Sequence, residues 1–263
     1  MNFSLYTGKK SALCTLEVLS DIPLPIRVEV LNPNKAYTKY TDRTHTLTNK
    51  KSVFYIRMPQ TPEYVVVKVN PSQSITKLEM LGSNLRIVPP KLSPLYAALS
   101  VKKWTGADSQ KAKKFMEFAQ PFCENAGILS SADSIYVSND WKFRIDYKDV
   151  LMDQGKPSST PARIESDTGR IEINKSRFQN YTVPERMAIL LHEFSHFYLN
   201  NKMNNEMEAD KNAFFIYLGM GYPRIDGLNA FNEIFKTSAE QIERNPRITP
   251  EQKAKWGELA KAR

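Results

Sequence analysis

Residues 182–199 read TVPERMAILLHEFSHFYL, and this stretch decides how the second half of the chain folds. Thr182 and Glu185 have the spacing of a capping box, and Pro184 suits the first turn of a helix. The apolar residues then recur at helical spacing, and they are Met187, Leu190, Leu191, Phe194, Phe197 and Tyr198. Four asparagines between residues 200 and 205 indicate where the helix ends. The stretch therefore predicts one helix with a broad apolar side.

This helix carries the pattern H-E-x-x-H at His192, Glu193 and His196. One helical turn separates the two imidazoles, so both lie on the same face and can bind one cation. Neutral imidazole is a good zinc ligand, and a catalytic zinc site keeps one position open for water. Glu193 lies beside that position and can exchange protons with the water. An ordinary polar helix face is the alternative, but the apolar neighbours make unpaired polar groups costly here.

The next helix is expected to supply the third ligand. Asn205 and Glu208 form a second capping pair, and Glu206 and Asp210 lie on one face of that helix at i and i+4. We expect Glu206 to be the metal ligand and Asp210 to accept a hydrogen bond from a ligand histidine. Only ten positions separate His196 from Glu206, so a small shift in register would make Asp210 the ligand instead.

H-E-x-x-H followed by E-x-x-x-D resembles the gluzincin-like zinc metallopeptidases over about residues 95–235. The resemblance implies a zincin-like domain that binds Zn²⁺ and hydrolyses peptide bonds with Glu193 as general base and acid. It implies metal ligands at His192, His196 and Glu206, with Asp210 supporting them. In that family the hairpin before the helix supplies an edge strand for the substrate, which corresponds to residues 162–174 here. The membrane-spanning helices of some members have no counterpart in this chain, and its spacer is shorter than theirs.

Residues 1–88 have the pattern of a β-sandwich. Short runs rich in β-branched and aromatic residues alternate with turn signals, and they are FSLYT, ALCTLEVLS, IRVEVLN, SVFYIRM, YVVVKV and NLRIV. The proline-rich segment 89–94 then indicates a linker. We predict an α+β protein with a sandwich at 1–88, a zincin-like domain at 95–240 and a basic C-terminal helix or tail at 241–263.

Before the motif helix, the second domain shows one helix and several strands. Apolar spacing predicts a helix at about residues 107–126, and SIYVS and WKFRIDYK have strand composition. The segment 162–174 alternates around Asp167-Thr168-Gly169, whose glycine suits a turn with positive φ. The sequence therefore predicts a hairpin directly before the motif helix.

Composition limits the classes of protein that the chain can belong to. The 263 residues are 41% hydrophobic and 25% charged with a net charge of +9, and no segment is apolar enough to span a bilayer. The first residues, MNFSLYTGKK, lack the apolar run of a secretory signal, so we expect the protein in the cytoplasm where it is made. Cys14 and Cys123 are expected to be reduced and buried. The basic residues are mixed with acids and match no nucleic-acid motif, so we expect no nucleic-acid partner.

Two other functions fit the sequence less well. A zincin beside a β-sandwich in a lysine- and asparagine-rich chain also resembles virion proteins of crAss-like tailed phages. That resemblance implies a tail or ring protein, a homo-oligomer or a partner of other virion proteins, in which the metal site serves assembly without turnover. A nucleic-acid-binding module is the third reading, and it predicts binding that weakens steeply with salt. The partner of the enzyme itself would be a peptide or protein substrate.

Several other residues are set aside as site candidates. His45 is expected to be an exposed loop histidine far from the motif. Four residues near the motif have side chains that could stabilise an oxyanion, but core packing or capping is the simpler interpretation of each, and they are Tyr198, Tyr217, Tyr222 and Arg224.

Overall fold

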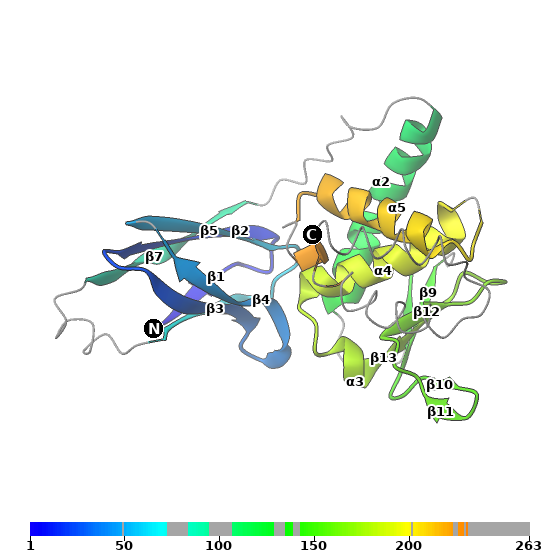
Figure 1. Ribbon diagram of the computed structural model, residues 1–263, viewed down its shortest axis with the longest axis horizontal. Helices are drawn as coiled ribbons and strands as arrows, with labels where there is room; N and C mark the ends of the chain where they lie inside the picture. Colours follow the sequence, from blue (N-terminus) through cyan, green and yellow to red (C-terminus); the bar gives the residue numbers. More distant parts are fainter. Residues whose placement is uncertain are drawn as a thin grey trace, which may run out of the picture.

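The computed structural model is a mixed α+β protein with two parts, a pair of β-sheets and a helical part built on a small sheet (Figure 1). It describes the ranges that follow: 1–48, 50–72, 84–94, 107–128, 135–138, 143–200, 202–222, 226–228 and residue 230. The expected C-terminal helix or tail at 241–263 lies outside the described residues.

The N-terminal part consists of two antiparallel sheets with one shared core. The first sheet has the order β1 (Asn2–Tyr6), β6 (Tyr64–Pro71), β3 (Leu24–Asn32) and β4 (Lys35–Leu47). The second has the order β5 (Lys51–Met58), β2 (Ala12–Ser20) and β7 (Leu85–Pro94). Alternate residues of β2 and β3 are buried, as expected for strands with one face toward a core. This is the arrangement of a β-sandwich.

Strand β4 is the element that sequence patterning missed. We predicted His45 in an exposed loop, but it lies within β4, is half-buried and packs against the Phe54 ring with 4.6 Å between centroids. The segment is rich in threonine and tyrosine, which favour strands although they are not strongly apolar. Thr38 and Tyr40 are buried from this strand. The interpretation of His45 as a loop residue was therefore wrong.

The proline-rich segment 89–94, for which we predicted a linker, forms the second half of β7. Lys91 pairs with Thr15 and Val88 pairs with Glu17, so the two prolines between them bulge opposite a single β2 residue. Strand β7 lies at an edge of its sheet. An edge strand with a bulge accommodates prolines because their missing N–H groups leave no ladder bond unmade.

The second part begins with α2 (Ala107–Ile128), which matches the helix expected at 107–126. A four-stranded sheet follows in the order β12 (Ala162–Ile164), β13 (Ile171–Asn174), β9 (Arg144–Lys148) and β8 (Ile135–Val137). The predicted hairpin is confirmed, because β12 pairs antiparallel with β13 and Gly169 in the turn has φ +68°. Strand β12 lies at one edge of this sheet and β8 at the other.

Two small elements adjoin this sheet. The hairpin β10 (Met152–Asp153) and β11 (Lys156–Pro157) precedes β12. The short helix α3 (Lys175–Phe178) follows β13 and leads toward the motif helix. Both are short, and only the hairpin takes part in the site described below.

The motif helix is α4 (Val183–Tyr198), and its predicted capping box is present. Thr182 accepts a hydrogen bond from the Glu185 backbone amide, and the Glu185 carboxylate accepts one from the Thr182 amide. Contrary to the expectation of one apolar side, α4 is buried on nearly every side from Val183 to His196. Helices α2 and α5, strand β12 and strand β4 all contact it. Helix α4 is therefore a central helix, and these neighbours cover the face that a surface helix would expose to solvent.

Arg186 anchors the start of α4 although its side chain carries a charge. It is only 1% exposed, and its guanidinium donates to the carbonyl oxygens of Phe178, Tyr181, Gly127 and Gln179. These hydrogen bonds compensate the cost of burying the cation. The side chain thereby joins α4 to the end of α2 and to the segment that follows α3.

Helix α5 (Glu206–Gly219) follows α4 after a short turn and packs against it, and the sandwich contacts the end of α5. Arg57 of β5 donates to the Met220 carbonyl oxygen at 3.1 Å, where a cation also suits the negative end of the helix. Arg43 of β4 forms an ion pair with Asp226, and the Asp226 side chain is 5% exposed. Two arginines of the sandwich thus hold the segment that ends α5.

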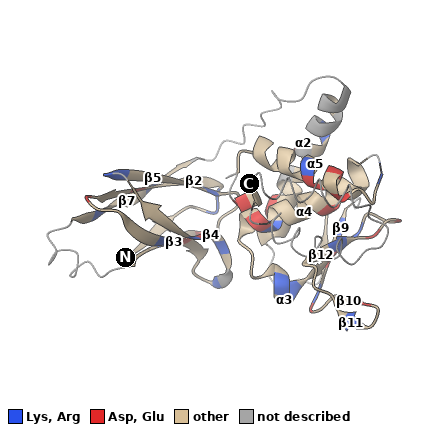
Figure 2. Ribbon diagram, in the orientation of Figure 1, with Lys and Arg blue, Asp and Glu red and all other residues tan. Residues whose placement is uncertain are grey.

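The remaining expectations on the chain as a whole concern cysteines and membranes. Cys14 and Cys123 are free and buried, as expected. Within the part of the chain that the structure describes, no helix has the length and apolar character needed to cross a membrane. Lys and Arg are distributed over both parts rather than gathered on one element (Figure 2).

Candidate metal centre

Helix α4 brings the two motif histidines together. The Nε2 atoms of His192 and His196 are 3.0 Å apart, and the two rings are nearly perpendicular. The side chains are 4% and 8% exposed. A spacing of four residues on a straight helix produces this juxtaposition directly.

The turn between α4 and α5 brings Glu206 to the same point. Its Oε2 atom lies 3.4 Å from Nε2 of His192 and 3.3 Å from Nε2 of His196. The three residues form a group whose ligand atoms all lie within 4.8 Å of one another. Asn205 begins α5 by accepting a hydrogen bond from the Glu208 amide, so the helix starts at the residue that the sequence indicated. These three side chains could hold one cation.

Each histidine also has a partner on its far side. Nδ1 of His192 lies 2.8 Å from Oδ1 of Asp210, and Nδ1 of His196 lies 2.6 Å from the Met203 carbonyl oxygen. Both partners only accept hydrogen bonds, which assigns the proton of each neutral ring to Nδ1. The lone pairs on both Nε2 atoms then point toward each other and toward the Glu206 carboxylate. Three converging acceptors repel one another unless a proton or a metal ion lies between them.

The same close contacts shift the pKa values of His192 and Glu206. Burial alone lowers the pKa of His192, but hydrogen bonds to Asp210 and Glu206 outweigh burial and raise the pKa to about 10. Burial also opposes ionisation of Glu206, yet hydrogen bonds from His192 and His196 hold its pKa well below the usual range. Without a metal ion, the group therefore retains a proton that a cation would have to displace.

Glu193 lies between the histidines and the edge strand. Its side chain is buried, and burial raises its pKa even though both histidines and a hydrogen bond from the Ile164 amide favour the ionised form. Ile164 is the last residue of β12. A carboxylate whose pKa is raised holds a proton more readily, which suits a group that must first accept a proton and then donate it.

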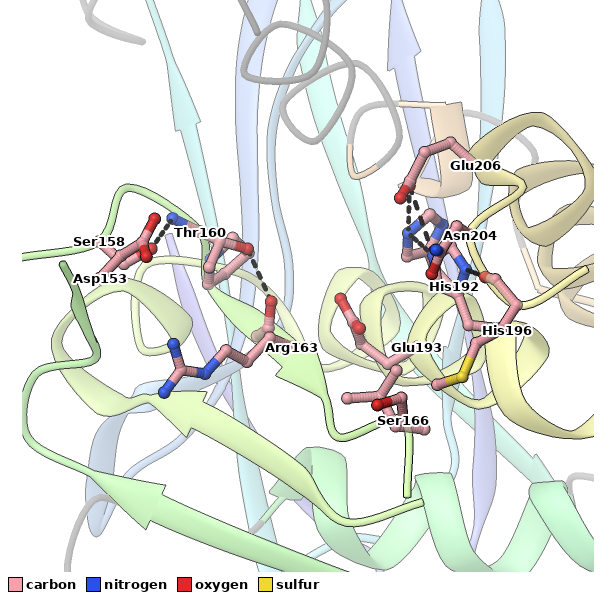
Figure 3. Close-up of a pocket in the computed structure, with 14 residues that line it drawn as sticks. Asp153, Ser158, Thr160, Arg163, Ser166, His192, Glu193, His196, Asn204 and Glu206 are labelled. Carbon is pink, nitrogen blue, oxygen red and sulfur yellow. Dashed lines mark hydrogen bonds and ion pairs between the residues drawn. The ribbon is translucent and has the colours of Figure 1, made fainter. Parts of the chain in front are cut away.

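Four side chains of the site border one cleft of about 510 Å³, and they are His192, Glu193, His196 and Glu206. Asp210 does not line the cleft and lies behind His192. Figure 3 shows Glu206 and Asn204 at one end of the cleft, Asp153 and Ser158 at the other, and Glu193 between them. Ala162, Arg163 and Ile164 of β12 form a wall. The volume lies in the range of sites that accommodate small ligands or parts of peptides.

Part of this cleft is formed by residues that were not predicted to belong to a site. Asp153 and Ser158 belong to the β10–β11 hairpin and its end, a segment for which we predicted no strand and no site residue. Gly155 was the available signal in the sequence, because glycine suits a hairpin turn that needs positive φ. In the structure both Gln154 and Gly155 have positive φ. Met203 and Asn204 were considered only as parts of the turn, although both line the cleft.

The tyrosines that were set aside lie outside the cleft wall. Tyr217 is fully buried and Tyr222 is 4% exposed, and neither lines the cleft. Tyr198 packs against Phe118, Phe143 and Phe194. Arg224 lies outside the described residues. Core packing is therefore the role that the structure shows for the three tyrosines.

Comparisons with protein-family models, with curated proteins and with solved structures found no match to this chain. The function proposed below accordingly depends on the geometry of the cleft and on the residues that line it.

Proposed function

We propose that this protein is a zinc-dependent metallopeptidase with a zincin-like domain behind an N-terminal β-sandwich. His192, His196 and Glu206 hold the ion, Glu193 is the general base and acid, and Asp210 orients His192. The supporting observation is the convergence of two Nε2 lone pairs and a carboxylate oxygen beside a buried glutamate at the wall of a cleft.

The distances among the three ligand atoms fit a zinc ion. Bonds of about 2.0 to 2.1 Å in a tetrahedron put neighbouring ligand atoms about 3.3 Å apart. The observed separations are 3.0, 3.3 and 3.4 Å. Two imidazoles and one carboxylate also form a ligand set typical of catalytic zinc, which leaves a fourth position for water or substrate.

The residues around the ion have distinct tasks in hydrolysis. Zinc bound in this group would polarise the attacking water and the scissile carbonyl. Glu193 takes the proton of that water and passes it to the leaving amine, and its raised pKa suits both transfers. The edge strand β12 could offer an extended peptide across the cleft those backbone groups that Thr160 and Glu193 do not engage, which is the role that the resemblance implied for residues 162–174.

Glu193→Gln tests the chemical role of the glutamate. The variant keeps the shape of the side chain and all three metal ligands, so zinc should still bind with a stoichiometry of one, while peptide hydrolysis should fall by at least about 100-fold. Zinc is measured by elemental analysis of the purified full chain, and hydrolysis by mass spectrometry of a random peptide mixture. Hydrolysis at the original rate by the variant would contradict the proposed role.

His196→Ala provides the complementary measurement. It removes one ligand, so zinc content and hydrolysis should be lost together, and part of the thermal stability that zinc provides should be lost with them. A wild-type protein with one zinc ion and no cleavage of any peptide would instead favour the assembly role of a virion protein. A wild-type protein without zinc affinity would contradict both functions.

A further inference from the structure

The end of the cleft opposite the metal group carries its own charged residues. Besides Glu193 and Glu206, the charged side chains that line the cleft are Asp153 and Arg163. A bound Zn²⁺ ion would neutralise the two negative charges of Glu193 and Glu206. The net charge of the rest of the cleft would then depend on Asp153 and Arg163. The inference below concerns that end and rests on the proposed peptidase function.

Arg163 is engaged within the wall of the cleft. Its Nε and Nη2 atoms both lie 2.7 Å from Oε2 of Glu172, and its Nη1 donates to the Met152 carbonyl oxygen at 3.1 Å. The Glu172 side chain is 3% exposed, so this contact is partly shielded from water. All three guanidinium nitrogens therefore have partners in the protein, and the side chain connects β12 to the β10–β11 hairpin.

The same contacts hold the backbone on either side of Asp153. The Met152 carbonyl that Arg163 binds belongs to the preceding residue, and Ser158 closes the hairpin with a 2.7 Å hydrogen bond to the Leu151 carbonyl oxygen. Among the described residues no cation forms an ion pair with Asp153, although Lys156 lies opposite in the hairpin. A carboxylate that forms no ion pair with the described residues thus lines a cleft in a protein whose net charge is +9.

The side chains next to Asp153 at this end of the cleft are also polar. Ser158 and Thr160 lie beside Asp153 in the cleft wall, and Figure 3 shows these three residues grouped on the side away from the histidines. A large apolar side chain would find few apolar partners there. An extended cationic side chain could reach the carboxylate and donate to the neighbouring hydroxyl groups.

We propose that Asp153 is a specificity-determining residue and selects peptides that place a lysine or arginine side chain at this end of the cleft. Such a side chain would form an ion pair with a carboxylate that forms none with the residues that the structure describes. Because Asp153 is exposed, the gain is modest, and we expect about a fivefold preference for lysine over an uncharged side chain of similar length.

The test measures binding, so it does not depend on turnover. Peptidyl hydroxamates carry lysine, norleucine or glutamate at each of three positions next to the zinc-binding group, and calorimetry gives their affinity for the zinc-loaded full chain. At one position lysine should bind about fivefold more tightly than norleucine, and glutamate should bind most weakly. Asp153→Asn should remove this preference, and Asp153→Lys should reverse it toward glutamate.

Glu63→Gln is the matched control, because it removes one carboxylate from the exposed surface of the sandwich and should leave the lysine preference unchanged. Equal affinities at every position, or a preference that survives in Asp153→Asn, would overturn the proposal while leaving the peptidase function intact. A preference for glutamate would overturn it and assign selectivity to Arg163. Failure of every hydroxamate to bind would contradict the metal site and with it both proposals.

Discussion

Nδ1 of His192 and Oδ1 of Asp210 are 2.8 Å apart, and this contact links the motif helix α4 to helix α5. Its effect is to place the ring proton of His192 on Nδ1 and to direct Nε2 toward Glu206. The helix that carries Glu206, the proposed third ligand, thereby also orients one of the two histidines. Such partners of ligand histidines raise the basicity of the ring and fix its orientation.

Replacement of Asp210 should therefore weaken metal binding without removing a ligand. We expect Asp210→Asn to reduce zinc affinity by about 10- to 100-fold, because the neutral amide holds the ring proton less strongly. Competition with a chromophoric chelator measures the change. Glu208→Gln on the same helix is the control, since its carboxylate contacts Asn205 rather than a histidine, and its affinity should equal that of the wild type. Unchanged affinity in Asp210→Asn would show that the contact does not serve the metal.

Zinc affinity should increase with pH across the neutral range. Hydrogen bonds to Asp210 and Glu206 raise the pKa of His192 to about 10 in the metal-free protein, so below that pH zinc must displace a proton. Each unit of pH lost then weakens apparent affinity by up to about tenfold per displaced proton. Glu206 adds nothing to this dependence near neutrality, because its pKa is lowered. Chelator competition at several pH values, with calorimetry in two buffers, checks both the affinity and the released proton; an affinity independent of pH would contradict the prediction.

Local patterns were enough to predict α2, α4 and α5 and the residues that α4 and α5 bring together. The caps at Thr182 and Asn205 depend on residues three positions apart, and the histidines on one helical turn. The assignment of Glu206 and Asp210 to different sides of His192 needed only the i, i+4 spacing and a sharp turn. These features are encoded within about 20 residues, so tertiary packing does not have to be known.

Contacts between distant segments could not be predicted in the same way. The burial of α4 on nearly every side depends on β4 and on α2, which are remote in sequence. Strand β4 itself lacks a strongly apolar pattern, and prolines 89 and 90 fit a strand only because β7 is an edge that bulges there. The far end of the cleft was missed because Arg163 connects the β10–β11 hairpin to β12 through side-chain contacts.

Gly221 lies at another contact between distant segments, where the sandwich meets the end of α5. Its φ is +78°, and an added Cβ atom would lie 2.8 Å from the Arg57 guanidinium. That guanidinium also donates to the Met220 carbonyl oxygen. Gly155 has a similar φ of +80° but no atom within 4 Å of an added Cβ. A substitution at Gly155 therefore tests backbone strain alone, whereas one at Gly221 tests strain together with steric crowding.

Gly221→Ala should consequently destabilise the protein more than Gly155→Ala. Both substitutions place an alanine at positive φ, which costs about 1 kcal/mol. Only Gly221→Ala also displaces Arg57, and the lost hydrogen bond adds about 1 to 2 kcal/mol to the decrease in unfolding free energy. Chemical denaturation of both variants measures the difference. In an Arg57→Ala background the extra cost should disappear, because no guanidinium remains to be displaced; persistence of the difference there would mean that Gly221 is required for another reason.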